Sequence, residues 1–217
     1  MNSRTHATER GNALVTGGSR RIGRAIVEAL AADGWTVGIH CHRSTTDAET
    51  LQRGIEAAGG RAYLTDETAT ASMLEVAAGQ GGPLTCLVNN ASLFERDDAA
   101  GATRESWQAH LDTNLTAPFF LSQYLANNLP PDTDGNIVNI VDQRAVNLQP
   151  GFVSYTVSKA ALWAMTQSLA LALAPRIRVN AVGPGPTLPS PRQTDEQFAR
   201  QAAGVPLGHG APPEEIA

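Results

Sequence analysis

Tyr155 and Lys159 are two residues of complementary acid–base chemistry that stand four positions apart. In a helix this spacing places both side chains on one face, one turn apart. A phenol has a pKa of about 10 and exchanges protons poorly at neutral pH, whereas a nearby ammonium stabilises the phenolate and lowers that pKa. A shift of about two units corresponds to roughly 2.7 kcal/mol. We expect the pair to act in proton transfer, although the spacing alone is common.

Asp142 ends an apolar, β-branched run and lies thirteen residues before Tyr155. An ionised carboxylate there would repel a developing alkoxide, but it could exchange a proton with the tyrosine and with a ring nitrogen. The alternative is a tolerated residue in a weakened or inactive enzyme.

Ser92 and Phe94 follow another apolar run. A phenyl ring is suited to stacking on a flat heterocycle, although Phe94 could equally be an apolar anchor of its loop.

A glycine-rich turn over residues 16–23 follows the first apolar run and opens the first helical segment. Glycines allow the backbone to approach a pyrophosphate, and the helix N-terminus offers free N–H groups and a positive dipole. A guanidinium pairs well with phosphate oxygens, although an arginine at a helix start can also face solvent. We expect cofactor contacts from Gly17, Ser19, Arg20, Arg21, Ile22 and Gly23.

The segment after the second apolar run, His40-Cys41-His42-Arg43-Ser44, contains no acidic residue. NAD enzymes of this type usually place an acid there on the ribose hydroxyls, whereas a cation and a hydroxyl suit the 2′-phosphate of NADP. The sequence therefore predicts NADPH, bound by His42, Arg43 and Ser44. A metal site in this segment is disfavoured because strand alternation sends neighbouring side chains to opposite faces.

Short apolar runs alternate with longer helical segments along the chain. This pattern predicts one α/β domain with a Rossmann-like, doubly wound parallel sheet in a three-layer α/β/α arrangement. Strands are expected at Asn12–Thr16, Trp35–His40, Arg61–Thr65, Pro83–Asn89, Asn136–Asp142 and Arg176–Val182. Helices are expected at Arg20–Asp33, Thr46–Ala58, Ala71–Ala78, within Arg104–Asn128, and at Phe152–Ala174. Irregular loops are expected at Gly183–Pro191 and at Thr187–Phe198, which should cover the substrate.

These motifs and their order resemble the short-chain dehydrogenase/reductase family from about Asn12 to the C-terminus. Gly17 and Gly23 match the outer glycines of its phosphate motif. Arg21 stands where the family normally has the middle glycine, and Asp142 stands where it normally has serine. Both departures are similar to the pteridine reductase branch, and so is the His-Arg-Ser stretch ending at Ser44.

The resemblance also implies roles for single residues. Lys159 would hold the nicotinamide ribose, Asn114 would anchor a water in a proton relay, and Arg21 would lie near both pyrophosphate and substrate. Asp66, after the third strand, could accept from the adenine amino group or cap a helix. Asn90 and Ala91 would back the adenine side of the cofactor, Pro184, Gly185 and Thr187 would lie near its nicotinamide end, and Ser92 and Phe94 would border the substrate.

Three functions are compatible with these residues and with the resemblance. The first is an NADPH-dependent reductase of the short-chain family that acts on a pteridine such as dihydrobiopterin, dihydromonapterin or dihydrofolate, with Tyr155 as proton donor. The second is a general carbonyl reductase or alcohol dehydrogenase of the same family. The third is a non-catalytic NADPH-binding sensor or scaffold, which has little need for both Tyr155 and Lys159.

Length, net charge, cysteine content and the lack of long apolar runs narrow the class of protein and its partners. The 217 residues suit one domain, expected over residues 12–217 after a flexible segment at 1–11, and a net charge of −5 argues weakly against nucleic-acid binding. We expect Cys41 and Cys86 to be buried thiols. The sequence contains no apolar run long enough for a membrane span and begins without a signal peptide, so a cytoplasmic protein is the default.

The C-terminal region departs from the family pattern. The phrase Pro212-Pro213-Glu214-Glu215-Ile216 opens a further helix in the family, and a final strand follows it there. We expect a C-terminally short chain in which the strand at Arg176–Val182 has an exposed edge. The family resemblance implies a homo-oligomer, commonly a homotetramer assembled through the long helices and that final strand region.

Overall fold

A computed structural model describes residues 10–65, 70–190 and 193–217 of the chain. Its centre is a six-stranded parallel sheet in the order β3-β2-β1-β4-β5-β6, which is the doubly wound order expected from the sequence. The strands are β1 (Asn12–Val15), β2 (Thr36–His40), β3 (Arg61–Thr65), β4 (Leu84–Asn89), β5 (Gly135–Ile140) and β6 (Ile177–Val182). All six predicted strands are thus present, with ends within two residues of their predicted positions.

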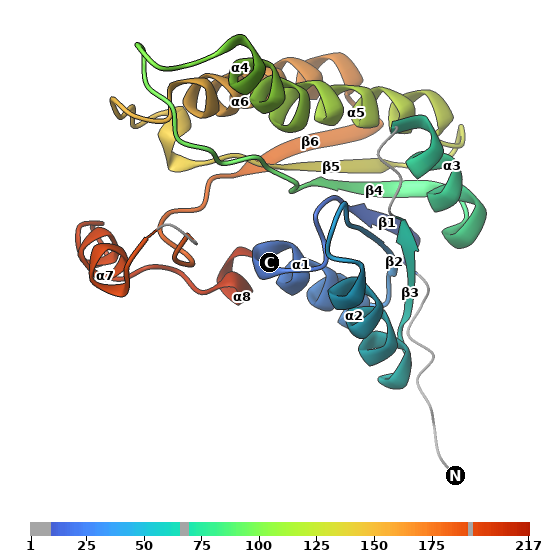
Figure 1. Cartoon of the computed structure of the whole chain (residues 1–217). Coiled ribbons are helices and arrows are strands. Elements are labelled where there is room, and N and C mark those ends of the chain that lie inside the picture. The colour runs from blue at the N-terminus through green and yellow to red at the C-terminus, as the bar shows by residue number, and fades with distance from the viewer. Residues whose placement is uncertain (1–9, 66–69, 191–192) are drawn as a thin grey trace.

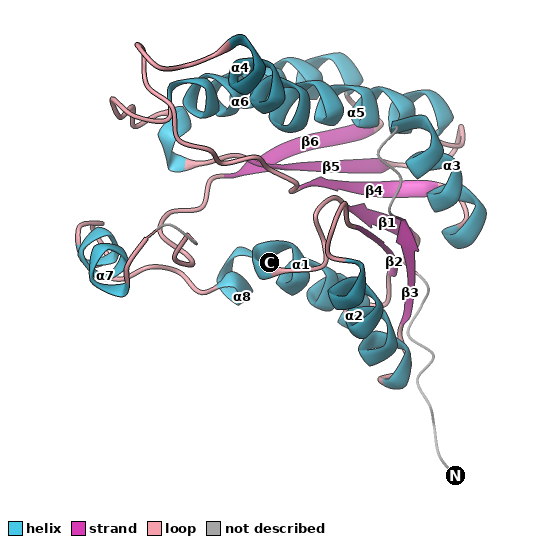
Figure 2. Ribbon diagram, in the orientation of Figure 1, coloured by secondary structure: helices cyan, strands magenta, loops and turns pink. Residues whose placement is uncertain are grey.

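Helices cover both faces of the sheet, as Figure 1 and Figure 2 show. The helices α1 and α2 lie on one face, and α4, α5 and α6 lie on the other, so the fold has three layers. The helices are α1 (Arg21–Ala32), α2 (Thr45–Ala57), α3 (Thr70–Gly81), α4 (Arg104–Leu111), α5 (Ala117–Asn128), α6 (Val153–Leu173), α7 (Asp195–Ala203) and α8 (Pro213–Ile216).

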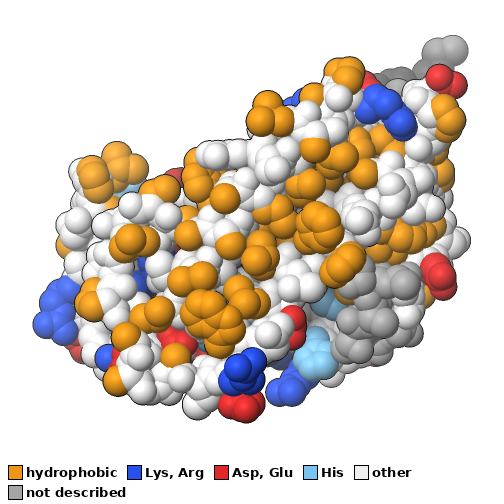
Figure 3. Space-filling model, turned by 90° about the horizontal axis from the view of Figure 1, so that it is seen from above, with side chains coloured by type: hydrophobic (Ala, Val, Ile, Leu, Met, Phe, Trp, Pro, Cys, Tyr) orange, Lys and Arg blue, Asp and Glu red, His pale blue; other side chains and the backbone are white. Residues whose placement is uncertain are grey.

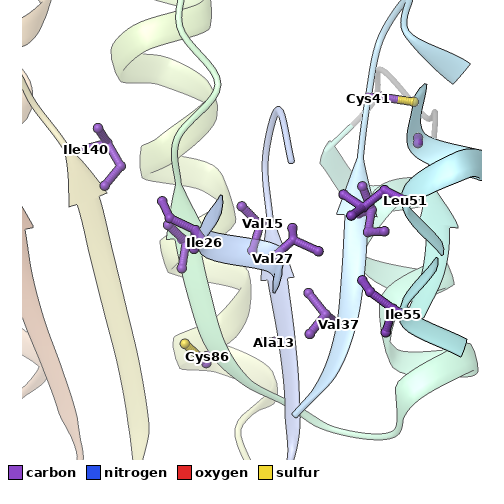
Figure 4. Packing of buried hydrophobic residues seen from close by; sticks show 13 residues of the cluster. Ala13, Val15, Ile26, Val27, Val37, Cys41, Leu51, Ile55, Cys86 and Ile140 are labelled. Carbon is purple, nitrogen blue, oxygen red and sulfur yellow. The ribbon is translucent and has the colours of Figure 1, made fainter. Parts of the chain in front are cut away.

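Two hydrophobic clusters join the helices to the sheet. The first lies between the sheet and the α1–α2 layer and includes Val15, Ile26 and Leu51 (Figure 4). The second lies on the opposite face and includes Leu74, Leu125 and residues of β4, β5 and β6. All four residues of β1 are buried, so this central strand has no solvent-facing side. Burial on both faces explains the near-continuous apolar strands.

The long helix expected within Arg104–Asn128 is divided into three parts. A capping box between Thr103 and Ser106 starts α4. A π-helical turn, Asp112–Thr116, then separates α4 from α5. Such turns often occur at functional sites, and this one contains Asn114. The sequence predicted the helical character of the segment but contained no signal for the wider turn.

The expected loop Thr187–Phe198 is only partly irregular. A capping box between Thr194 and Gln197 starts α7, which the sequence prediction missed. The phrase that opens a further helix in the family forms α8 in this chain, although the sequence was expected to lack that helix, and α8 packs against α1. At the other end of the chain, nearly all of the flexible segment expected over residues 1–11 falls outside the described residues.

Three further expectations concern the thiols, the edge of the sheet and membrane spans. Cys41 and Cys86 are buried, as predicted. The strand β6 has a neighbour on one side only and is an edge of the described sheet. No helix among the described residues is long and apolar enough to cross a membrane.

Candidate active site

The loops after β1, β4, β5 and β6 meet at the carboxyl edge of the sheet. The strand order reverses between β1 and β4, and such a switch point is where sheets of this kind bind ligands. Thr16, directly after β1, joins two of these loops, because its hydroxyl oxygen accepts hydrogen bonds from the N–H groups of Asn90 and Ala91, both at 3.0 Å. This role of Thr16 was not predicted from the sequence.

Two glycines of the turn resist replacement, Gly17 because of its backbone conformation and Gly23 because of a close contact. Gly17 has a φ of +62°, and a Cβ atom at Gly23 would lie 2.2 Å from the carbonyl oxygen of Gly17. The amide nitrogen of Asn90 donates to the carbonyls of Thr16 and Gly17 at 2.9 and 3.1 Å. The turn is therefore a fixed backbone surface at the start of α1, and it fits a pyrophosphate.

Arg21 has a φ of +53°, in the left-handed region that favours glycine. This conformation explains physically why the family has a glycine here. The Arg21 guanidinium donates to the carbonyl oxygens of Leu188 and Pro189, at 3.2 and 3.0 Å. The side chain therefore holds the loop after β6. The expectation that Arg21 also reaches the substrate stays a prediction.

The residues expected around the 2′-phosphate gather beside the same turn. The hydroxyls of Ser19 and Ser44 are 2.5 Å apart, which joins the phosphate turn to the segment after β2. Arg20 forms an ion pair with Asp47 in the first turn of α2. His42 and Arg43 are exposed. Two hydroxyls and the exposed guanidinium of Arg43 at one place fit a phosphate group.

His40 lies against the glycine-rich turn. Its Nδ1 atom accepts a hydrogen bond of 3.2 Å from the N–H of Gly17, a contact that was not predicted from the sequence. Asp66 lies outside the described residues. Ile22 is half-buried and packs against the first hydrophobic cluster. Its side chain supports α1, which leaves its backbone as the group that could meet a cofactor.

Tyr155 and Asp142 are directly bonded. The Tyr155 hydroxyl donates to Oδ2 of Asp142 at 2.7 Å, and Oδ1 of Asp142 accepts from the N–H of Arg144 at 2.8 Å. Burial raises the pKa of Tyr155 well above its usual value, and the charge and hydrogen bond of Asp142 raise it further. The sequence predicted that a neighbouring ammonium would lower this pKa. That prediction was wrong in direction, because burial and the carboxylate dominate.

Lys159 is almost completely buried and is the only lysine in the chain. Its Nζ donates to the carbonyl oxygen of Ile140 at 2.7 Å and lies 6.0 Å from the centre of the Tyr155 ring. Burial lowers the pKa of Lys159 to about 8, and the charge of Asp142 opposes this shift. The amine is thus held beside the tyrosine, on the same face of α6, as its spacing predicted.

Asn114 lies in the π-helical turn and forms hydrogen bonds with Leu93 and with Ser158 of α6. Its Oδ1 accepts from the N–H of Leu93 at 2.8 Å, and its amide nitrogen donates to the carbonyl of Leu93 at 3.0 Å and to the Ser158 hydroxyl at 2.9 Å. Both amide hydrogens are therefore used within the protein. One acceptor position of Oδ1 remains for the water that the predicted relay requires.

Phe94 lies against Tyr155, while its expected place at the border of the substrate stays a prediction. Its ring stacks parallel on Phe152 with centroids 4.4 Å apart, and meets Tyr155 edge-to-face with centroids 4.7 Å apart. The Arg144 guanidinium lies over Phe152, 5.1 Å from the ring centre. Ser92 is exposed. Phe152 and Arg144 were not predicted from the sequence, and their closeness to Tyr155 and Asp142 in the chain was the signal that could have identified them.

The loop after β6 starts at the same edge of the sheet. The N–H of Gln143, next to Asp142, donates to the carbonyl of Pro184 at 3.4 Å, and the Thr187 hydroxyl donates to the carbonyl of Gly185 at 3.2 Å. The start of the loop therefore lies beside Asp142, while Arg21 holds its middle. The expected position of Pro184, Gly185 and Thr187 near the reacting end of a cofactor stays a prediction.

A dinucleotide turn at the switch point, a buried Tyr-Lys pair and a doubly wound sheet together define an oxidoreductase of the Rossmann type. The family model for short chain dehydrogenases matches residues 11–200. The chain therefore belongs to the short-chain dehydrogenase/reductase family.

Two relatives bear on the branch of the family. The crystal structure of the alternative dihydrofolate reductase FolM from Brucella suis, in complex with NADP, is 45% identical, with a TM-score of 0.94 over 96% of this chain and 85% of that one. Pteridine reductase 1 of Leishmania tarentolae is 34% identical over 90% of this chain and 83% of its own length. The resemblance inferred from the motifs is confirmed, and the predicted cofactor agrees with the NADP in the first of these structures.

Other activities occur among relatives of similar identity. The 3-oxoacyl-[acyl-carrier-protein] reductase of a Synechocystis strain is 31% identical over 94% of this chain and 85% of its own length. Identity at this level therefore does not select a substrate, and the side chains of the site must do so.

Proposed function

We propose that this protein is an NADPH-dependent reductase whose substrate is a pteridine, such as a dihydropterin or dihydrofolate. The observation that carries the proposal is the bond between the Tyr155 hydroxyl and the Asp142 carboxylate, at 2.7 Å, with the Phe94 ring against the same tyrosine. A carboxylate at this position repels the oxyanion of a ketone under reduction, whereas it can accept from the N–H groups of a pteridine. The likeness to FolM and to pteridine reductase 1 supports this choice.

The turn at residues 16–23, with Ser44 and Arg43, would hold the pyrophosphate and the 2′-phosphate of NADPH. The fit depends on the close backbone approach at Gly17 and Gly23 and on the paired Ser19 and Ser44 hydroxyls. When bound there, NADPH supplies a hydride to an electron-poor ring carbon.

Tyr155 supplies the proton that balances this hydride. The hydroxyl is protonated at neutral pH, and because burial and Asp142 raise its pKa, it needs a neighbouring positive charge to act as an acid. The O–H bond breaks, and an N–H bond forms at the ring nitrogen next to the reduced carbon. Lys159, buried beside the ring, provides the positive charge that stabilises the resulting phenolate.

The test is NADPH oxidation with dihydrobiopterin, dihydromonapterin and dihydrofolate, in parallel with a panel of ketones. We expect turnover of at least one pteridine and a fall in kcat of roughly a thousandfold in Tyr155→Phe, because a positioned general acid contributes on this order. The affinity for NADPH, measured by fluorescence titration, should stay within about twofold of the parent, since the phenyl ring preserves the packing.

Two outcomes of the same assay would overturn the proposal. Turnover of ketones alone would favour a general carbonyl reductase. Tight NADPH binding without oxidation across the panel would favour a sensor or scaffold. An Asp142→Ser variant sharpens the distinction, because it should lose pteridine activity and gain activity on ketones if Asp142 is matched to ring nitrogens.

We also infer a homo-oligomer that forms through the outer face of α4, α5 and α6. Large apolar side chains are exposed there, and hydrophobic atoms are spread across this face in Figure 3. They are Trp107, Phe119, Phe120, Val157, Trp163 and Leu171. A second copy of the same face would bury them. Light scattering after gel filtration tests this, and Phe120→Asp should yield a smaller species. A tetramer and a cytoplasmic location stay predictions.

A further inference from the structure

His110 is completely buried in α4 and links two segments that border the candidate substrate site. Its Nε2 accepts a hydrogen bond of 3.1 Å from the N–H of Glu95, the residue that follows Phe94. Its Nδ1 lies 2.7 Å from the hydroxyl of Ser154, the residue that precedes Tyr155. One side chain thus joins the segment of the proposed stacking ring to the turn of α6 that carries the proton donor.

The directions of these bonds follow from the donors present. Because the backbone N–H of Glu95 must donate, Nε2 has no proton, and Nδ1 carries the proton of the neutral ring. That proton faces the Ser154 hydroxyl and the Ser106 carbonyl, which is 2.9 Å away. The Ser154 hydroxyl in turn donates to Oδ2 of Asp97, which is also buried.

Asp97 joins the same network through its carboxylate and its backbone carbonyl. Its Oδ1 accepts from the N–H of Ser154 at 3.2 Å, and its backbone carbonyl accepts from the N–H of Phe152 at 2.8 Å. The segment 93–97 and the residues 152–154 are therefore tied at several points. The two stacked rings, Phe94 and Phe152, lie between these ties.

The same arrangement repeats one helical turn further along. Asn114 follows His110 by four residues and binds both backbone groups of Leu93, on the other side of Phe94. It also donates to Ser158, four residues after Ser154. The segment that holds Phe94 is therefore fixed at position 95 by α4 and at position 93 by the π-helical turn that follows it. The family resemblance assigns a role to Asn114 alone and leaves His110 without one.

We propose that His110, Ser154 and Asp97 form a positioning network that fixes the Phe94–Phe152 stack relative to Tyr155 and so sets the selectivity for flat-ring substrates. This inference rests on the proposed function for its substrate class. A buried polar network of this kind is more costly to bury than an apolar residue of similar volume, and when fully bonded it specifies one geometry. The residues act through Phe94 and Tyr155 and are not themselves catalytic.

The experiment compares two partial mimics of His110 in the full-length protein. His110→Asn places an amide near the Nδ1 position and loses the bond to Glu95, whereas His110→Gln places an acceptor near the Nε2 position and keeps it. Ser154→Ala removes the central hydroxyl. Ser122→Ala is the matched control, because Ser122 is equally buried and bonds only to the Pro118 carbonyl within its own helix.

We expect His110→Asn and Ser154→Ala to raise KM for a dihydropteridine about tenfold, with kcat changed less than about twofold, because Phe94 would bind the substrate ring without exchanging the proton. His110→Gln should stay within about threefold of the parent. Amide hydrogen exchange should rise at residues 92–97 in His110→Asn and remain low there in His110→Gln and Ser122→Ala.

Equal changes in kcat and KM, or faster exchange throughout the domain, would show a role in stability alone and would overturn the proposal. So would exchange at residues 92–97 that is the same in the asparagine and glutamine variants. Absence of pteridine turnover in the parent protein would overturn the proposed function instead. The exchange comparison requires no substrate, so it still decides whether the network positions the Phe94 segment.

Discussion

The two halves of the candidate active site are held by different kinds of interaction. The phosphate half, around β1 and β2, is a backbone surface in which Gly17 and Gly23 exclude side chains. The substrate half, around β5 and α6, is a set of buried side chains bonded to one another, with Asp142, Tyr155 and Lys159 at its centre. We therefore expect the phosphate half to be sensitive to added atoms and the substrate half to lost hydrogen bonds and charges.

An added methyl group tests the phosphate half most directly. In Gly23→Ala the new Cβ would lie 2.2 Å from the Gly17 carbonyl, so the turn must shift. We expect the Kd for NADPH to rise roughly hundredfold, because the backbone donors around the pyrophosphate move together. Fluorescence titration measures the Kd, and a thermal melt confirms that the variant is folded.

Gly54→Ala is the matched control for this change. Gly54 lies inside α2, and a Cβ there would meet nothing within 4 Å. Alanine should stabilise the helix by up to about 1 kcal/mol and leave the affinity for NADPH unchanged. Parent-like NADPH binding by Gly23→Ala would contradict the view that this half is a close-fitting backbone surface.

Removing the buried charge tests the substrate half. Because the pKa of Lys159 is lowered to about 8 in the folded protein, the unfolded chain binds more protons between pH 8 and the usual lysine value of 10.5. The buried ammonium therefore lowers the free energy of unfolding most below pH 8, and this destabilisation decreases as the pH rises through this window. Lys159→Met should abolish turnover and stabilise the protein at pH 7 by up to about 3 kcal/mol.

Urea unfolding at several pH values measures this effect. The stability difference between Lys159→Met and the parent should shrink as the pH rises from 8 towards 10.5. Loss of the bond to the Ile140 carbonyl opposes the gain by about 1 kcal/mol. A variant that is less stable than the parent at pH 7 and at pH 10 alike would show that the buried ammonium is not destabilising.

The charge of Asp142 provides a smaller test of the same half. The carboxylate raises the pKa of both Tyr155 and Lys159, so Asp142→Asn should lower both. The alkaline decline in kcat/KM, which we assign to loss of the Lys159 charge near pH 8, should move to lower pH. Since Lys159 is the only lysine, isotope-labelled lysine gives a single side-chain NMR signal that reports its pKa directly. An unchanged pKa would show that the two groups are not coupled.

The sequence predicted the sheet and the Tyr155–Lys159 pair because both depend on local patterns. Apolar runs specify the strands, and a four-residue spacing specifies one face of a helix. It could not predict the sign of the Tyr155 pKa shift, which depends on burial and on Asp142 together. Nor could the sequence predict the contacts of His110, since a histidine among polar residues of a helix does not indicate which segments pack against it. The helix α7 was missed although its capping box is local.

Arg21 connects the two halves and offers the smallest effect. Glycine at this position would relieve a left-handed conformation that is unfavourable by about 1 kcal/mol for other residues, but it would remove both bonds to the loop after β6. We expect Arg21→Gly to change the free energy of unfolding by less than about 1 kcal/mol, because these terms oppose one another at an exposed position. Limited proteolysis should instead cut faster near Leu188 and Pro189. Lys would keep the charge but not the two-point contact, so Arg21→Lys should show the same faster cleavage, and parent-like cleavage in both variants would mean that Arg21 does not hold the loop.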